Sequence, residues 1–157
     1  MPAEQLSLPA EWHQRQILGG FPHDVLGDIR LPFAPTAPSA ARSLVHALAL
    51  AWDVGHVAEQ AELCVSEIVT NAYQHAAEAG PHPLRLIILQ VKDRLRYEVY
   101  DASPKMPRPK HPDTFDESGR GLFLLEMTAE DHGAYRLSVG KSVWFELVAW
   151  SDHGDRQ

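Results

Sequence analysis

Apolar positions recur with the period of an α-helix in two stretches of the chain. Over residues 40–52 the pattern predicts an amphipathic helix whose apolar stripe consists of Leu44, Ala47, Leu48 and Ala51. Over residues 57–79 it predicts a longer helix whose stripe consists of Ala61, Val65, Ile68, Ala72 and Ala76. Ser39 is the N-cap candidate of the first helix, and the Gly80–Pro83 cluster ends the second.

Four further stretches have the pattern of β-strands. Residues 25–34 alternate loosely and predict an edge strand, where a proline is tolerated. Residues 84–92 and 95–103 predict two successive strands. In the second of them the two faces consist of Leu95, Tyr97 and Val99, and of Arg96, Glu98 and Tyr100. Residues 135–150 predict a final hairpin with Gly140 and Lys141 at its turn.

The order of these elements predicts the fold class. A polar, proline-rich loop over residues 103–118 leads into a short apolar helix over residues 122–129. The whole order favours an α+β fold, a two-layer sandwich with helices on one face of a mixed, mostly antiparallel sheet. We expect one domain over residues 25–150, an N-terminal extension over residues 1–24 and a tail over residues 151–157.

Composition narrows the range of partners and locations. The chain has 157 residues and a net charge of −7, which disfavours nucleic acid and anionic membranes as partners. No apolar run approaches the roughly 20 residues of a membrane helix, and the N-terminus lacks the pattern of a signal peptide. We therefore expect a cytoplasmic protein. The single cysteine, Cys64, excludes an internal disulfide and is interpreted as a buried structural thiol.

The second helix carries the most informative polar residues. Glu67, Asn71 and His75 are spaced four apart, so a helix places them on one side, next to the apolar stripe. An amide oxygen is a suitable ligand for Mg²⁺, and a carboxylate one turn away can act as a general base. The alternative is a solvated helical face with ordinary hydrogen bonds.

Two loops add candidate binding groups. Asp101 follows a predicted strand and can accept a hydrogen bond from an exocyclic amine, although such an aspartate often only caps a turn. Gly119, Arg120 and Gly121 precede a predicted helix, where glycine backbone and helical N–H groups favour phosphate. The alternative for this segment is a flexible loop with a glycine hinge.

Taken in order, these segments resemble a known superfamily. ELCVSEIVTNAYQHA resembles the N box of the GHKL (Bergerat-fold) ATPases, DASP the first glycine box and SGRGL the second. The closing GKSVWFEL is similar to the last strand of the small bacterial branch that contains the anti-sigma-factor serine kinases. The resemblance covers about residues 25–149. Ser103 and Pro104 stand where the first glycine box usually carries glycines, which implies a stiffer loop.

The resemblance implies a site for ATP and Mg²⁺ and a role for each matching residue. Glu67 matches the general base, Asn71 the Mg²⁺ ligand and Asp101 the adenine-binding aspartate. The remaining residues of the implied nucleotide site are His75, Ser103, Gly119, Arg120, Gly121, Leu122 and Ser142. Of these, the segment around Arg120 matches the lid over the phosphates, and Ser142 the small hydroxyl residue near the adenine.

The resemblance also implies a function and partners. It implies a serine/threonine kinase that phosphorylates a STAS-domain anti-anti-sigma protein, controls a sigma factor and forms a homodimer. The sequence shows no long helix with a phosphoacceptor histidine before the domain, so we do not expect an autophosphorylating histidine kinase. Two alternatives remain: a nucleotide-dependent interaction module without kinase activity, and, ranked lower, a basal ATPase or clamp.

Overall fold

The computed structural model describes residues 23–79, 82, 84–106 and 124–150. Its elements follow one another as β1 (Asp24–Leu31), α2 (Ala37–Ala51), the short 3-10 helix η2 (Gly55–Val57), α3 (Ala58–Ala79), β2 (Leu84–Val91), β3 (Arg94–Asp101), β4 (Asp131–Arg136) and β5 (Lys141–Val148). Residues 124–128 form a short helical segment before β4. None of the described helices is long and apolar enough to cross a membrane.

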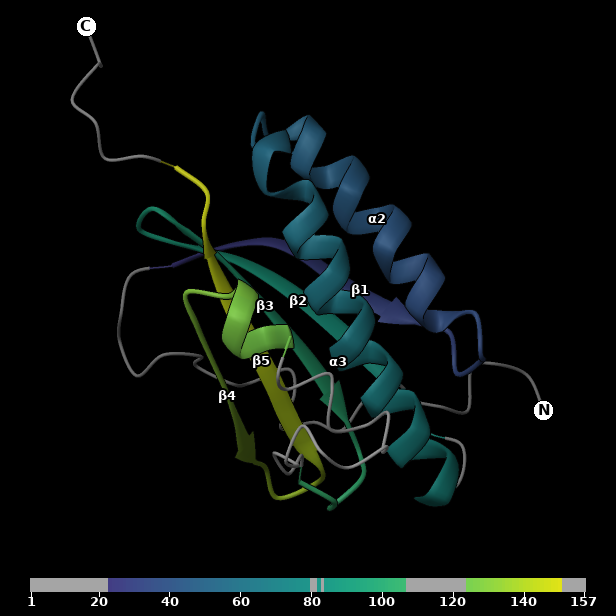
Figure 1. The fold of residues 1–157 in the computed structure, drawn as a ribbon. Coiled ribbons are helices and arrows are strands. Elements are labelled where there is room, and N and C mark those ends of the chain that lie inside the picture. The colour runs from purple at the N-terminus through teal and green to yellow at the C-terminus, as the bar shows by residue number, and fades with distance from the viewer. Residues whose placement is uncertain (1–22, 80–81, 83, 107–123, 151–157) are drawn as a thin grey trace, which may run out of the picture.

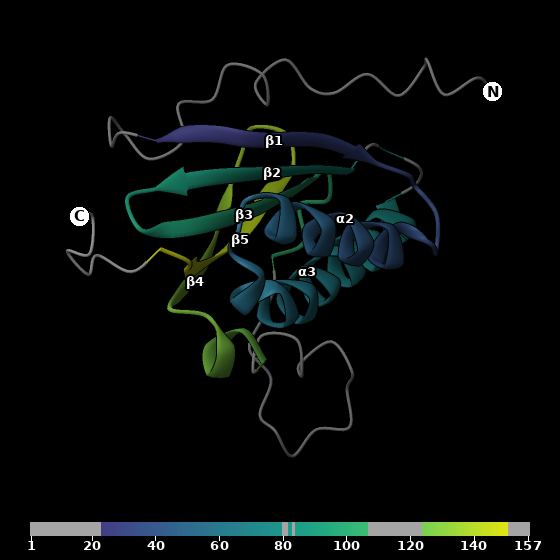
Figure 2. The same ribbon diagram turned by 90° about the horizontal axis from the view of Figure 1, so that it is seen from above.

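The strands form a single five-stranded sheet covered on one face by the two long helices. The strand order is β1-β2-β3-β5-β4, with every neighbouring pair antiparallel. Helices α2 and α3 pack side by side on the same face of this sheet, as Figures 1 and 2 show. The predicted α+β sandwich is confirmed, with an antiparallel sheet rather than a mixed one, and β1 is the predicted edge strand.

The main core lies between these helices and the sheet. From α3 it includes Ala61, Val65, Ile68 and Ala72, as the apolar stripe predicts, while the side chain of Ala76 lies outside the described part. The strand residues facing them include Leu84, Leu86, Ile88, Leu95, Tyr97 and Val99. Each large aliphatic side chain buried here contributes about 1.5–3 kcal/mol to folding. The core thus fixes α3 over the middle strands.

The prediction for α2 is wrong in two respects. The residues that it buries are Ala37, Ala41, Val45 and Ala49, whereas the predicted Ala47 and Ala51 are exposed. Small side chains at most of the buried positions let α2 lie close to α3, and the predicted Leu44 and Leu48 are half-buried. Nor is Ser39 the N-cap, because the helix begins at Ala37 with a proline in its first turn, where its missing N–H costs nothing.

The final hairpin differs from the prediction at its turn. Strand β4 already begins at Asp131, and the turn occupies residues 137–140, closed by a hydrogen bond from the Leu137 N–H to the Gly140 carbonyl (3.0 Å). Gly140 adopts the left-handed conformation (φ +78°), which glycine permits. Lys141 is therefore the first residue of β5 and not a turn residue. The direction of its side chain therefore follows the alternation of side chains along β5.

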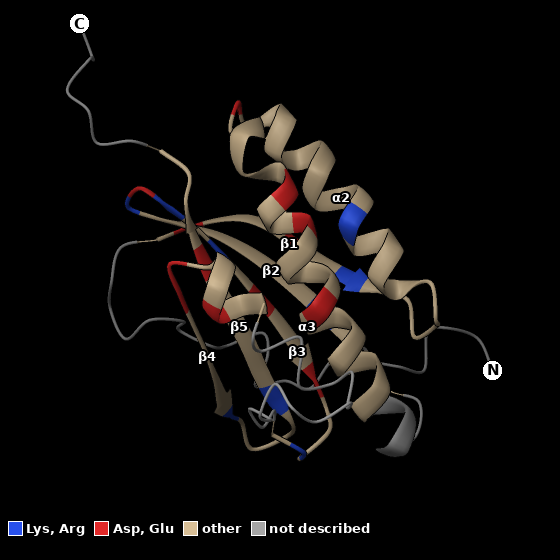
Figure 3. Ribbon diagram, in the orientation of Figure 1, with Lys and Arg blue, Asp and Glu red and all other residues tan. Residues whose placement is uncertain are grey.

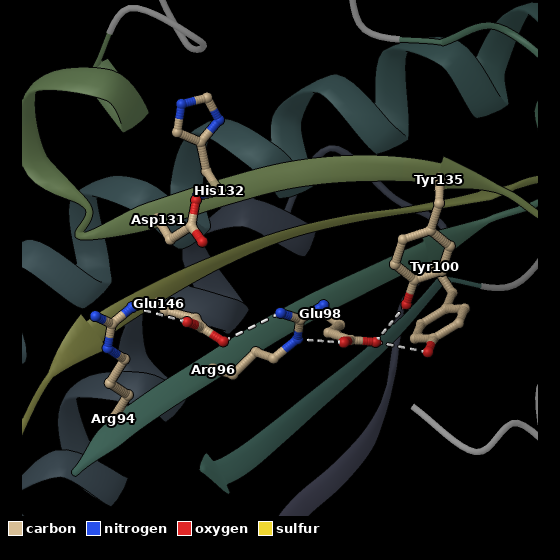
Figure 4. A network of polar contacts seen from close by, with 8 residues as sticks. All are labelled: Arg94, Arg96, Glu98, Tyr100, Asp131, His132, Tyr135 and Glu146. Carbon is tan, nitrogen blue, oxygen red and sulfur yellow. Dashed lines mark hydrogen bonds and ion pairs between the residues drawn. The ribbon is translucent and has the colours of Figure 1, made fainter. Parts of the chain in front are cut away.

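The sheet face away from the helices carries a chain of ion pairs that runs from the partly exposed Arg94 to the buried Glu98 (Figure 4). Glu146 accepts hydrogen bonds from Arg94 and Arg96, each at 3.1 Å. Glu98, with a fully buried side chain, accepts a 2.6 Å bond from Arg96. It also accepts bonds from the hydroxyls of Tyr100 (2.7 Å) and Tyr135 (2.9 Å). The predicted division of β3 into an apolar face and a polar face is confirmed.

We expect the substitution Glu98→Gln to lower the free energy of unfolding by about 2 kcal/mol, the value of hydrogen bonds to a charged group. The amide keeps the size of the side chain, but in either orientation its NH2 group replaces an oxygen that now accepts hydrogen bonds, from the Arg96 guanidinium or from the two tyrosine hydroxyls. Urea denaturation measures the effect, with Glu130→Gln as a control at an exposed position. Equal stability of the two variants would contradict a role for this network in folding.

Candidate functional site

Helix α3 presents the three predicted polar residues along one side. Glu67, Asn71 and His75 are all half-buried, and Ile68 and Ala72 beside them are in the core. The predicted placement at the edge of the core is therefore confirmed. Such partly buried polar groups are suited to a ligand, because they are already shielded from part of the solvent.

Burial changes the acid–base properties of Glu67 and of Cys64 on α3. It raises the pKa of the Glu67 carboxyl, which makes the ionised form a stronger base than an exposed glutamate. Cys64 lies one turn earlier and is fully buried, and burial, together with the charge of Glu67, raises the pKa of its thiol to about 12. The thiol is thus protonated and unreactive, as its interpretation as structural requires.

Asp101 ends β3 with a fully buried side chain. Its Oδ1 accepts hydrogen bonds from the Ser103 N–H (2.8 Å) and from the Lys141 ammonium (3.0 Å). Burial raises the pKa of this carboxyl, and the contacts with Lys141 and Ser103 oppose that rise. Its Oδ2 is buried and has no hydrogen-bond partner within the described part of the chain. An oxygen of this kind is stabilised when a ligand supplies a donor.

Lys141 is a site residue that the sequence analysis missed. Its side chain is 1% exposed, and its Nζ lies 3.0 Å from Asp101 Oδ1 and 3.1 Å from His75 Nδ1. One ammonium group thus joins the end of β3 to the polar side of α3, which brings two of the predicted segments to one place. The signal that could have found it is strand parity, because Val143, Phe145 and Leu147 are apolar and face the helices.

The prediction for Ser142 is not supported by its position. The register pairs Ser142 with Tyr100 and Tyr135, whereas it pairs Lys141 with Asp101. Neighbouring strand residues point to opposite faces, so Ser142 lies on the face away from the helices and does not contact Asp101. The β5 residue that contacts Asp101 is Lys141.

Ser103 fixes the loop that follows β3 through two hydrogen bonds. Ser103 is 2% exposed, donates its backbone N–H to Asp101 and accepts a bond from the Lys105 N–H at its Oγ (3.1 Å). These two bonds hold the loop in a fixed course next to the aspartate. Gly119, Arg120, Gly121 and Leu122, the predicted lid, lie outside the described residues, so their role stays a prediction.

Two side-chain oxygen atoms fit the groups of a nucleotide with magnesium. Asp101 Oδ2 offers an acceptor for an exocyclic amine, and Asn71 offers an amide oxygen for a hard cation. Among the residues the structure describes, no group of three or more His, Cys, Asp and Glu residues is placed to hold a metal. Mg²⁺ bound with a nucleotide keeps several waters and is held largely by the phosphates, so its binding does not require such a group.

Comparison with known families agrees with this geometry. The model of the histidine kinase-like ATPase domain matches residues 31–147, which is more than half of the chain. The chain belongs to this family. The match includes α3, the end of β3 and the start of β5, so every described residue of the candidate site lies within the ATPase domain. No curated protein matches the chain. The GHKL superfamily of the resemblance is confirmed, and ATP binding is the activity that the family supports.

Proposed function

We propose that this ATPase domain binds ATP with Mg²⁺ and transfers the γ-phosphate to a serine or threonine of a partner protein. The observation that carries the proposal is the surroundings of Asp101 at the end of β3: its buried carboxylate has one oxygen without a partner among the described residues, and Lys141 joins it to His75 on the polar side of α3. In the proposed complex, the base of the nucleotide lies at Asp101 and the phosphates extend along α3 toward Asn71 and Glu67.

Each residue has a distinct part in the proposed reaction. Asp101 accepts a hydrogen bond from the exocyclic amine of adenine, and the Asn71 amide oxygen holds Mg²⁺. When bound, the metal neutralises charge on the phosphates. Glu67 accepts the proton of the attacking hydroxyl, a role that its raised pKa suits. The segment around Arg120 covers the phosphates. Phosphoryl transfer depends mainly on such positioning and charge neutralisation.

The proposed substrate is a STAS-domain anti-anti-sigma protein, and the proposed output is control of a sigma factor by a homodimer of this chain. The support for these partners is the resemblance of the GKSVWFEL segment to the anti-sigma-factor kinase branch. Incubation with labelled ATP and candidate STAS proteins tests the assignment. Transfer of label to a serine or threonine supports it, and label on no candidate contradicts this choice of substrate.

Calorimetric titration tests the binding step. We expect ATP with Mg²⁺ to bind the unmodified chain, and the substitution Asp101→Asn to weaken binding about tenfold to a hundredfold, because an amide nitrogen can replace the acceptor oxygen. Asp24→Asn, at an exposed position on β1, is the matched control and should leave the affinity unchanged. Absence of heat and of thermal stabilisation for the unmodified chain, with and without Mg²⁺, would contradict the proposed function.

A further inference from the structure

A buried lysine at a site for a nucleotide base needs an explanation of its own. Lys141 and Asp101 are 1% and 0% exposed, and they contact each other at 3.0 Å. In Figure 3 a basic position at the start of β5 lies beside an acidic position at the end of β3. A charged group without a partner is very unfavourable in such surroundings, so each of the two charges depends on the other.

The two carboxylate oxygens of Asp101 differ in their hydrogen bonding. Oδ1 has both of its lone pairs engaged, one by the Ser103 N–H and one by the Lys141 ammonium. Oδ2 has no partner within the described residues. The Lys141 ammonium is itself fixed by a second contact, with His75 Nδ1 at 3.1 Å. The carboxylate can therefore neither rotate freely nor exchange the roles of its oxygens.

Within the described part of the chain, the charged and titratable groups near Asp101 come from three segments. Lys141 contributes from β5, His75 from α3, and Lys105, whose charge acts on Lys141, from the loop after β3. Burial raises the pKa of Asp101 and lowers that of Lys141, and their contact opposes both effects. Among the described residues, loss of the ammonium would leave only the Ser103 N–H to oppose protonation of this carboxyl, since Lys105 is exposed.

We propose that Lys141 is a positioning residue for base recognition: by engaging Oδ1 it keeps Asp101 ionised, and it leaves Oδ2 as an acceptor that selects a purine with an exocyclic amine. The proposal rests on the proposed nucleotide binding and names the group that determines its selectivity. An ionised carboxylate accepts the amine of adenine but repels the oxygen that hypoxanthine carries at the same position. A protonated carboxyl can donate a hydrogen bond to that oxygen, so it no longer discriminates between adenine and hypoxanthine.

Infrared spectroscopy of the ligand-free protein tests the first half of the proposal. The substitution Lys141→Met keeps the length of the side chain and removes its charge. We expect the carbonyl stretch of a protonated carboxylic acid to appear at neutral pH in Lys141→Met, and to disappear again in the double variant with Asp101→Asn. A folded Lys141→Met protein without this band would overturn the proposal, because Asp101 would then stay ionised unaided. This result does not depend on whether the chain binds ATP.

Competition between ATP and inosine triphosphate tests the second half. We expect the unmodified chain to prefer ATP by about tenfold or more, and Lys141→Met to reduce this preference to about threefold or less, since one hydrogen bond to a charged group is at stake. A merely structural role would weaken both nucleotides alike and leave the ratio unchanged, which would overturn the proposal. Lys105→Met, which removes an exposed neighbouring charge, is the control and should keep the preference.

A second variant keeps the proposal testable if Lys141→Met does not fold. Lys141→Gln still donates a hydrogen bond to Oδ1 but carries no charge, so it should fold when Lys141→Met does not, and it should show the same infrared band and the same loss of preference. If the band appears as expected while neither nucleotide binds the unmodified chain, the proposed function fails and the role of Lys141 in ionising Asp101 stands. If ATP binds and the ratio is unaffected by both variants, the role of Lys141 in selectivity fails.

Discussion

Replacing Glu67 with glutamine is expected to lower phosphoryl transfer to the partner protein by about a hundredfold to ten-thousandfold, the usual contribution of a general base. The amide keeps the size of the side chain but cannot accept the proton of the attacking hydroxyl. ATP affinity should stay within about threefold of the unmodified value, since no step of base recognition depends on Glu67. Single-turnover transfer of labelled phosphate and calorimetry, measured on the same preparations, separate the two effects.

Glu59→Gln is the matched control, because it removes an exposed carboxylate from the first turn of the same helix. It should change neither transfer nor binding. If Glu67→Gln transfers phosphate as fast as the unmodified chain, the assignment of Glu67 as base is wrong. If the unmodified chain binds ATP but transfers no phosphate to any STAS protein, the second function applies, a nucleotide-dependent interaction module in which Asp101 and Asn71 bind and no phosphate moves.

The substitution Gly140→Ala is expected to lower the free energy of unfolding by more than about 4 kcal/mol, which is exceptional for a single methyl group. A Cβ at this position would lie 1.9 Å from the Asp101 carbonyl oxygen and 2.6 Å from the Ala102 Cα, and φ is +78°. Both neighbours are backbone atoms, so the turn itself must move, and the left-handed conformation adds strain. Urea denaturation measures the loss.

Gly55→Ala is the control for the loss of a glycine. Among the described atoms, a Cβ there would meet only Leu50 Cδ2, at 3.0 Å, which is the end of a flexible side chain. We expect a clearly smaller loss of stability than at Gly140. Because Gly140 precedes Lys141, any folded Gly140→Ala protein should also bind ATP more weakly. Equal stability of the two alanine variants would show that the close approach of the turn to Asp101 is unimportant.

The elements with a strong local pattern could be predicted from the sequence. The spacing of Glu67, Asn71 and His75 and the apolar stripe beside them placed α3 correctly, because both depend only on the helical period. The alternation of β3 was equally clear. The stripe of α2 was shifted because its buried positions are mainly alanines, which pattern analysis does not distinguish from exposed ones. Which of them is buried depends on the approach of α3.

The part of the site contributed by β5 could not be predicted, for a different reason. Glycine followed by lysine is a common turn pair, and a lysine is expected in solvent. Only the pairing of β5 with β3 shows that Lys141 lies opposite Asp101 and Ser142 opposite Tyr100. That register is a long-range property, since the residues concerned are 40 positions apart. A buried charge of this kind is visible only after its partner has been located.

The contact between Asp101 and Lys141 also has a consequence for biosynthesis. Asp101 is synthesised 40 residues before Lys141, so the growing chain contains the carboxylate before its counter-charge exists. The helices and strands that precede β4 can already pack together before β5 is synthesised. The proposed base site cannot form at that stage, because Lys141 is still missing. The contact between Asp101 and Lys141 therefore forms only after β5 has been synthesised and has paired with β3.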